Sequence, residues 1–183
     1  MSQEVGLVMN EQTQEEHIKE YAMEHPSWHA IQQACNEVFA PKIAELPEQP
    51  EYIVGLSRGG LIPAVILSHM TGIPLFPVKY SSKSGAGDNK NHDNELPMLP
   101  SEYESGSHCG MTSPTVLLVD DISDSGLTLR EVKDTYEYQG HNVYTAALYY
   151  KELSEPVITP DIIWRTIPED GPWIIFPWEQ KVK

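Results

Sequence analysis

The stretch VLLVDDISDSGLTL, residues 116–129, is the most informative part of this chain. Its four leading apolar residues run straight into two adjacent carboxylates, Asp120 and Asp121, and a third carboxylate, Asp124, follows. An apolar run that ends in acids is typical of a buried strand whose carboxyl end opens at a crevice. We therefore expect a strand over residues 115–119 and a ligand site directly after it.

Small polar residues follow these acids. Ser125, Gly126 and Thr128 precede a helical pattern and supply amide N–H groups, hydroxyls and a helix N-terminus, which together suit a phosphate. The simpler alternative is an ordinary helix capped by Asp124 or Ser125, but it leaves two further acids unexplained. Three acids beside an anion site indicate a phosphorylated ribose held with a divalent cation.

Strands and helices are predicted to alternate on both sides of this stretch. Apolar runs predict strands over 52–56, 75–80, 115–119, 142–150 and 161–166, and helical spacing predicts helices over 28–46, 61–70 and 128–139. Pro41 should bend or split the first helix. This alternation predicts an α/β fold, a parallel twisted sheet flanked by helices.

The predicted domain organisation is a flexible tail over 1–16 and a single domain over 17–183. Within that domain, residues 81–114 are rich in Ser, Gly, Asn, Asp and Pro, which is typical of a mobile lid or a disordered insert. Residues 168–183 contain the compact aromatic run GPWIIFPWE and are predicted to form a small C-terminal hood over the site.

The composition excludes several classes of protein. A net charge of −15 over 183 residues argues against non-specific binding to nucleic acid or to an anionic membrane. Two cysteines cannot form a disulfide framework, and the N-terminus has no signal pattern, so a cytoplasmic location is expected.

A second glycine-rich turn, Ser57-Arg58-Gly59-Gly60, follows the strand predicted at 52–56. The two glycines should let the backbone approach a ligand closely and adopt positive φ. Taken alone, the segment fits a solvated arginine on a turn as well as it fits an anion site.

The acidic stretch resembles the diphosphate-sugar signature of the type I phosphoribosyltransferases, a strand, two acids, two usually apolar residues and then Asp-(Ser/Thr)-Gly-x-Thr. Ser123 is the one departure, because family members usually carry a branched apolar residue there. The resemblance implies that Asp120 and Asp121 hold the ribose hydroxyls and Mg²⁺, and that Asp124 exchanges a proton with the base. The residues that would wrap the ribose phosphate are Asp124, Ser125, Gly126, Leu127 and Thr128.

The same resemblance assigns the glycine-rich turn to the diphosphate. Ser57, Arg58, Gly59 and Gly60 would grip it, Arg58 would neutralise the charge that develops on the leaving group, and a cis peptide bond is expected before Arg58. A flexible loop at the position of residues 81–114 would close over the reaction centre.

Further similarity, from about residue 28 to residue 179, is to the bacterial xanthine–guanine group of purine phosphoribosyltransferases. That similarity implies that Lys151 donates to the exocyclic oxygen of a 6-oxopurine, that Trp173 stacks on the base, and that the backbone of Ile174 reads its edge. Ile175 departs from the group, which has an acid there. Members are commonly homodimers or homotetramers, so a homo-oligomer is expected.

Three functional hypotheses follow. The leading one is an enzyme that transfers phosphoribosyl from phosphoribosyl diphosphate to guanine, xanthine or hypoxanthine with Mg²⁺, without nucleic-acid or membrane partners. The second is a non-catalytic regulator that binds phosphoribosyl diphosphate, since a fold does not guarantee a reaction. The third is a phosphoribosyltransferase for a pyrimidine or a modified base.

Overall fold

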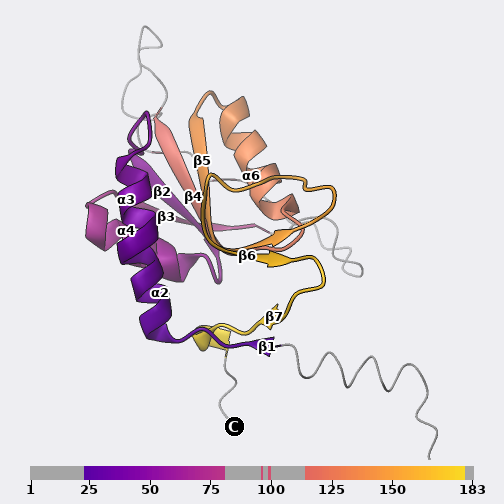
Figure 1. Ribbon diagram of the computed structural model, residues 1–183. Coiled ribbons are helices and arrows are strands. Elements are labelled where there is room, and N and C mark those ends of the chain that lie inside the picture. Colours follow the sequence, from indigo (N-terminus) through magenta and orange to yellow (C-terminus); the bar gives the residue numbers. More distant parts are fainter. Residues whose placement is uncertain (1–22, 81–95, 97–98, 100–113, 180–183) are drawn as a thin grey trace, which may run out of the picture.

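A five-stranded parallel sheet forms the centre of the molecule (Figure 1). The computed structural model describes residues 23–80, 96, 99 and 114–179. The strands are β2 (Tyr52–Ser57), β3 (Leu75–Lys79), β4 (Thr115–Ser123), β5 (Asn142–Glu152) and β6 (Ile162–Pro168), in the order β3-β2-β4-β5-β6. The predicted parallel α/β architecture is confirmed.

Helices cover both faces of this sheet (Figure 1). One face carries α2 (Trp28–Ala34), the π-helix η1 (Cys35–Phe39), α3 (Ala40–Ala44) and α4 (Leu61–Thr71), and the other carries α6 (Leu127–Tyr138). The first three form one continuous element in which Ala40 N–H donates to the carbonyl of Cys35, five residues earlier. Pro41 was expected to bend or split this helix; the structure has a π turn directly before the proline, which has no N–H to donate, and the helix continues to Ala44.

Two apolar clusters fill the space between the sheet and the helices. The first lies under α2, η1 and α4 and includes Cys35, whose burial raises its thiol pKa to about 12. The second lies under α6 and includes Leu96 and Leu99, both buried. These two residues belong to the predicted lid, most of which lies outside the described residues, as does the predicted tail over 1–16, so both assignments stay predictions.

A small second sheet lies beside the main one, at the bottom of Figure 1. It pairs β1 (Met23–Glu24) in parallel with β7 (Trp173–Ile174), and a 3₁₀ turn, Pro177–Glu179, follows. Within this turn region, Phe176 and Trp178 stack with their ring centroids 4.7 Å apart. The segment predicted as a C-terminal hood, called the hood below, therefore pairs with β1, which was not predicted; its covering of the site stays a prediction.

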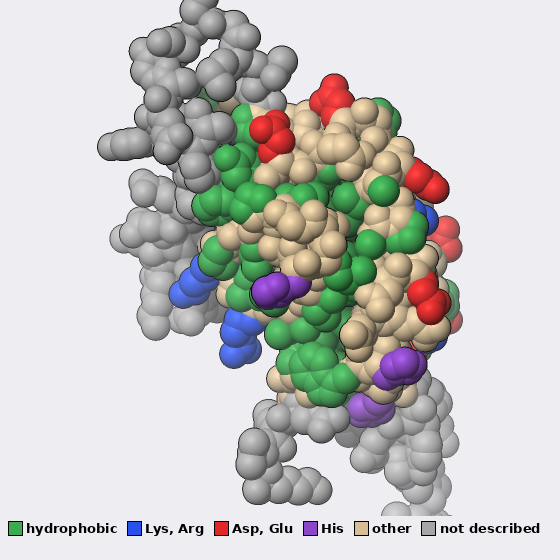
Figure 2. All heavy atoms as spheres, turned by 90° about the vertical axis from the view of Figure 1, so that its left-hand side faces the viewer, with side chains coloured by type: hydrophobic (Ala, Val, Ile, Leu, Met, Phe, Trp, Pro, Cys, Tyr) green, Lys and Arg blue, Asp and Glu red, His purple; other side chains and the backbone are tan. Residues whose placement is uncertain are grey.

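The face formed by α2, α3 and α4 is shown in Figure 2, where apolar side chains form an irregular band between polar ones. Exposed apolar side chains on these helices include Trp28, Val65 and Met70. Among the helices that the structure describes, none is both long and apolar enough to cross a lipid bilayer.

Candidate active site

The acid pair lies inside β4 rather than after it, because this strand runs to Ser123 instead of ending at the predicted Val119. Pairing between β2 and β4 does stop at Gly55 and Val119, whereas pairing between β4 and β5 continues to Ser123 and Tyr150. The last part of β4 therefore has a neighbour on one side only. On its other side, no strand of the described structure pairs with it.

The glycine-rich turn that follows β2 packs against this part of β4. A Cβ atom on Gly59 would lie 1.6 Å from Oδ2 of Asp121, and one on Gly60 would lie 2.4 Å from the carbonyl oxygen of Val119. The contacts at Gly60 are with backbone atoms, so only glycine fits there, whereas a side chain at position 59 would have to displace the Asp121 carboxylate. The expected positive φ is wrong for both, because the positive-φ glycines of the described residues are at positions 72, 126 and 140; close approach alone is the reason for glycine here.

The peptide bond between Ser57 and Arg58 is cis, as the resemblance implied. The Arg58 side chain is exposed and makes no ion pair with the residues that the structure describes. Arg58 lies on a turn whose glycines pack against β4, and its exposed guanidinium is available to an anionic group of a ligand.

The two acids are electrostatically frustrated. Desolvation, followed by the charge of Asp121, holds the pKa of Asp120 well above its ordinary range. Burial likewise raises the pKa of Asp121, and the negative charge of Glu179 in the hood adds to the rise. The Glu179 carboxylate accepts from Phe176 N–H at 2.9 Å, and its influence on Asp121 was not predicted from the sequence although the residue stands in the quoted aromatic run.

This arrangement fits a divalent cation. Desolvated carboxylates that repel one another are relieved by a cation, and Mg²⁺ commonly takes one or two carboxylates together with substrate oxygens. In the described part of the chain, no group of three His, Cys, Asp or Glu side chains could hold a metal ion by itself. Asp120 and Asp121 would therefore hold Mg²⁺ only with help from a ligand.

Replacing Asp120 by Asn should stabilise the fold at alkaline pH. The folded-state pKa of Asp120 is raised, so its contribution to stability is present at low pH and is lost as the pH rises through that value. Asn keeps the oxygen that accepts from Asp121 N–H at 2.9 Å. Urea unfolding without Mg²⁺ should show a larger gain in unfolding free energy at pH 8 than at pH 5.5.

A control for this measurement is Asp161→Ala. The Asp161 carboxylate accepts from the backbone N–H and the hydroxyl of Thr145 at 2.7 and 2.8 Å, so its loss should destabilise the protein. If Asp120→Asn destabilised it equally at pH 8, the acid pair would not be frustrated.

The loop after β4 encloses a pocket of about 100 Å³. Its backbone turns at Gly126, with φ of 76°, where a Cβ atom would lie 2.9 Å from Cγ2 of Ile158. The Ser125 hydroxyl accepts from Leu127 N–H at 3.4 Å at the start of α6. The pocket is lined by Asp120, Ile122, Ser123, Asp124, Ser125, Gly126, Thr128 and Leu129.

Lys151 lies at the edge of this pocket, where it forms an ion pair with the lining residue Asp124. Its Nζ lies 3.0 Å from Oδ1 of Asp124, with side-chain exposures of 24% and 48% for Lys151 and Asp124. The two residues come from neighbouring strands, since Lys151 lies near the carboxyl end of β5 and Asp124 directly follows β4. The structure thus brings together an acid and a cation that the resemblance assigns to the base.

Trp173 and Ile174, the two predicted base-binding residues, differ in their exposure to solvent. Trp173 is 62% exposed and Ile174 is buried in the core. No described contact joins the Trp173 ring to the acids or to Lys151, so its role in stacking stays a prediction. The Ile174 backbone is positioned by β1, because Ile175 N–H donates to the carbonyl of Glu24 at 2.9 Å.

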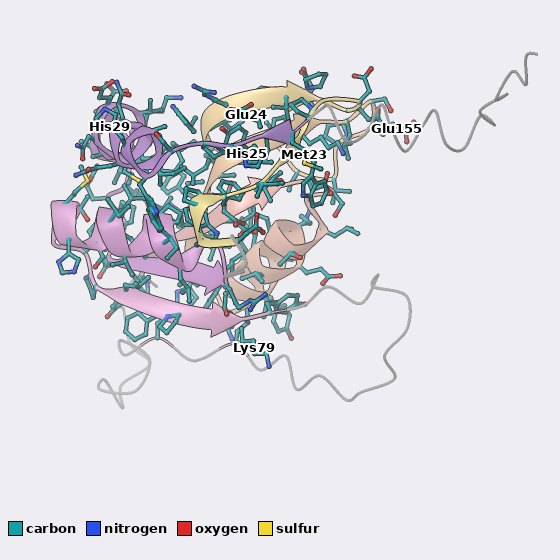
Figure 3. All side chains as sticks on the ribbon, turned by 90° about the horizontal axis from the view of Figure 1, so that it is seen from below. Met23, Glu24, His25, His29, Lys79 and Glu155 are labelled. Atoms are coloured by element: carbon teal, nitrogen blue, oxygen red, sulfur yellow. The ribbon has the colours of Figure 1, made fainter. Side chains whose placement is uncertain are left out.

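Glu24, labelled on β1 in Figure 3, connects this strand to the central sheet. Its Oε1 accepts from the buried Tyr149 hydroxyl at 2.6 Å and from Nη1 of Arg165 at 2.7 Å. Desolvation and the Glu24 carboxylate both raise the pKa of Tyr149, so it stays a neutral donor. β1, β5 and β6 therefore meet at one carboxylate, and β7 pairs with β1 through the backbone beside it.

Replacing Glu24 by Ala should destabilise the protein by about 1–3 kcal/mol, because the buried Tyr149 hydroxyl loses its acceptor. Arg165→Ala is the matched control, and it should cost only about 0–1 kcal/mol since this partner is half exposed. Urea denaturation measures both changes. Equal losses in the two variants would mean that the surface ion pair, and not the buried hydroxyl, dominates.

The chain matches a known protein family over most of its length. Residues 26–183 match the phosphoribosyl transferase domain. The chain belongs to the phosphoribosyltransferase family. The predicted enzyme class, a glycosyltransferase of pentosyl groups, is thereby confirmed.

Several phosphoribosyltransferases are similar over most of this chain. The xanthine-guanine phosphoribosyltransferase of Roseobacter denitrificans is 27% identical over 165 residues, which cover 87% of this chain and 86% of that protein. The crystal structure of a purine phosphoribosyltransferase from Pyrococcus horikoshii has a TM-score of 0.65 and 28% identity, and covers 88% and 97% of the two chains. A Helicobacter pylori xanthine-guanine-hypoxanthine phosphoribosyltransferase, 21% identical with a TM-score of 0.62 over 86% and 93% of the two chains, shares the fold.

Proposed function

We propose that this phosphoribosyltransferase transfers the phosphoribosyl group of phosphoribosyl diphosphate to a 6-oxopurine, namely guanine, xanthine or hypoxanthine. The products would be a nucleoside monophosphate and diphosphate. The observation that carries the proposal is the Lys151–Asp124 ion pair at the edge of the pocket formed by the loop after β4.

This pair matches the edge of a 6-oxopurine. Such a base presents an exocyclic oxygen beside an imidazole-ring nitrogen, and a lysine ammonium can donate to the oxygen while a carboxylate accepts the proton of the nitrogen. Adenine carries an amino group in place of the oxygen, which would set a donor against the Lys151 ammonium. The pair therefore favours oxopurines over adenine.

The reaction would break the bond between the ribose C1 and the diphosphate oxygen and form a bond from C1 to a base nitrogen. Asp124 would accept the proton released from the base, and Arg58 would neutralise charge developing on the diphosphate. Asp120 and Asp121 would orient the ribose hydroxyls, and the 124–128 loop would hold its phosphate. Bound to these acids, Mg²⁺ would supply further charge neutralisation for the diphosphate.

The test is release of diphosphate from phosphoribosyl diphosphate and Mg²⁺ in the presence of guanine, xanthine, hypoxanthine, adenine or uracil. Turnover with one or more of the three oxopurines, and far less with adenine and uracil, is expected. Binding of phosphoribosyl diphosphate without turnover of any base would indicate a regulator instead. A preference for uracil would contradict the oxopurine assignment.

The proposal also covers the location and the oligomeric state of the protein. We propose a cytoplasmic homodimer or homotetramer, as is common among relatives of this type. Sedimentation velocity on the purified protein measures the oligomeric state, and a single monomeric species at micromolar concentration would contradict it.

A further inference from the structure

We propose that the Ser123 hydroxyl is an additional donor to the 5-phosphate of the bound ribose. The inference rests on the proposed function and deepens it, because it adds a side chain to the phosphate subsite beyond the loop residues that the family resemblance assigns to it.

The Ser123 hydroxyl is buried and has no partner within the described structure. The residue is 3% exposed, and its Oγ makes no hydrogen bond in the part of the chain that the structure describes. An unpaired buried hydroxyl is costly, and native proteins contain few of them. A ligand that supplies the missing acceptor would explain why this group is present.

The location of Ser123 indicates which ligand group that is. Ser123 is the last residue of β4 and lines the same pocket as Ser125, Gly126 and Thr128 at the start of α6. These neighbours offer hydroxyl and amide donors, so the pocket is built for an acceptor-rich group. The expected base contacts lie instead at the Lys151–Asp124 pair, on the edge of this pocket.

The charge of the pocket makes an additional donor useful. Two carboxylates, Asp120 and Asp124, also line it and would repel a phosphate. Neutral donors facing the phosphate offset that repulsion without a buried cation. A branched apolar residue at position 123, as type I relatives usually carry, could donate nothing.

The experiment is calorimetric titration of ribose 5-phosphate and, separately, of inorganic diphosphate into the wild-type protein and into Ser123→Ala, both with Mg²⁺. The substitution should raise the Kd of ribose 5-phosphate by about tenfold, since a hydrogen bond to a charged group is lost. The Kd of diphosphate should stay unchanged, because its expected site is at Arg58.

Stability separates this role from a structural one. Ser123→Ala removes a hydroxyl that has no partner, so the free energy of unfolding should not fall. Ser68→Ala is the matched control, because the Ser68 hydroxyl donates to the carbonyl of Ile73 at 2.6 Å, away from the site. That variant should lose stability and keep the wild-type Kd for ribose 5-phosphate.

Two results would overturn the inference while leaving the proposed function intact. One is an unchanged Kd for ribose 5-phosphate in Ser123→Ala, and the other is an equal weakening of ribose 5-phosphate and diphosphate. If the wild-type protein bound neither phosphoribosyl diphosphate nor ribose 5-phosphate, the proposed function itself would fail and this inference with it.

Discussion

Replacing Asp124 by Asn should lower kcat with an oxopurine by about 10²–10⁴-fold, the usual contribution of a positioned acid or base. Asn keeps the size of the side chain but cannot accept a proton. The Kd of phosphoribosyl diphosphate should change little, because the loop hydroxyls and amides that hold the ribose phosphate remain. Steady-state kinetics together with calorimetry separates these two quantities.

The matched control is Asp134→Asn. Asp134 also pairs with a cation, Arg130, at 2.7 Å, but on the exposed face of α6, where both side chains are about half exposed. Its loss should leave kcat unchanged. Equal losses of turnover and of sugar-diphosphate affinity in Asp124→Asn would argue that Asp124 binds the ribose and does not exchange a proton.

Replacing Arg58 by Ala should lower kcat by about 10²–10³-fold, the cost of removing one group that stabilises transition-state charge. The diphosphate carries that charge as the bond to C1 breaks. Because the Arg58 side chain is exposed and makes no ion pair with the described residues, the free energy of unfolding should stay within about 0.5 kcal/mol of the wild type.

Arg130→Ala serves as the control for Arg58, since it also removes an exposed arginine, one whose side chain pairs with Asp134 on α6. It should retain full activity. An Arg58→Ala protein with normal kcat and only a weaker affinity for the base would place Arg58 outside the diphosphate site.

The sequence predicted the elements that have clear periodicity. The strand before the acids is uniformly apolar, and the helix over 61–70 ends near Gly72, which adopts the left-handed conformation expected of a helix end. Their order along the chain was enough to predict a parallel sheet with a site at its carboxyl edge. The principal error in this region was the end of β4, because acidic residues continue the strand along its pairing with β5.

Features that depend on tertiary contact could not be predicted. β1 is two residues long, too short to show any period, and Glu24 meets Tyr149 across 125 positions of sequence. The need for glycine at positions 59 and 60 was recognised, but its cause is the approach of β4 and not an unusual φ. The effect of Glu179 on Asp121 and the burial of the Ser123 hydroxyl both depend on tertiary contacts, so the sequence could not predict them.

The pairing of β1 with β7 has a practical consequence for work with the purified enzyme. The segment proposed to recognise the base is supported by residues that precede the first helix of the described fold. A recombinant form trimmed to begin at α2 would keep the whole central sheet and every acidic residue of β4. It would lack the strand on which Trp173 and Ile174 rest, so poor use of bases by such a protein would report on the trimming and not on the native enzyme.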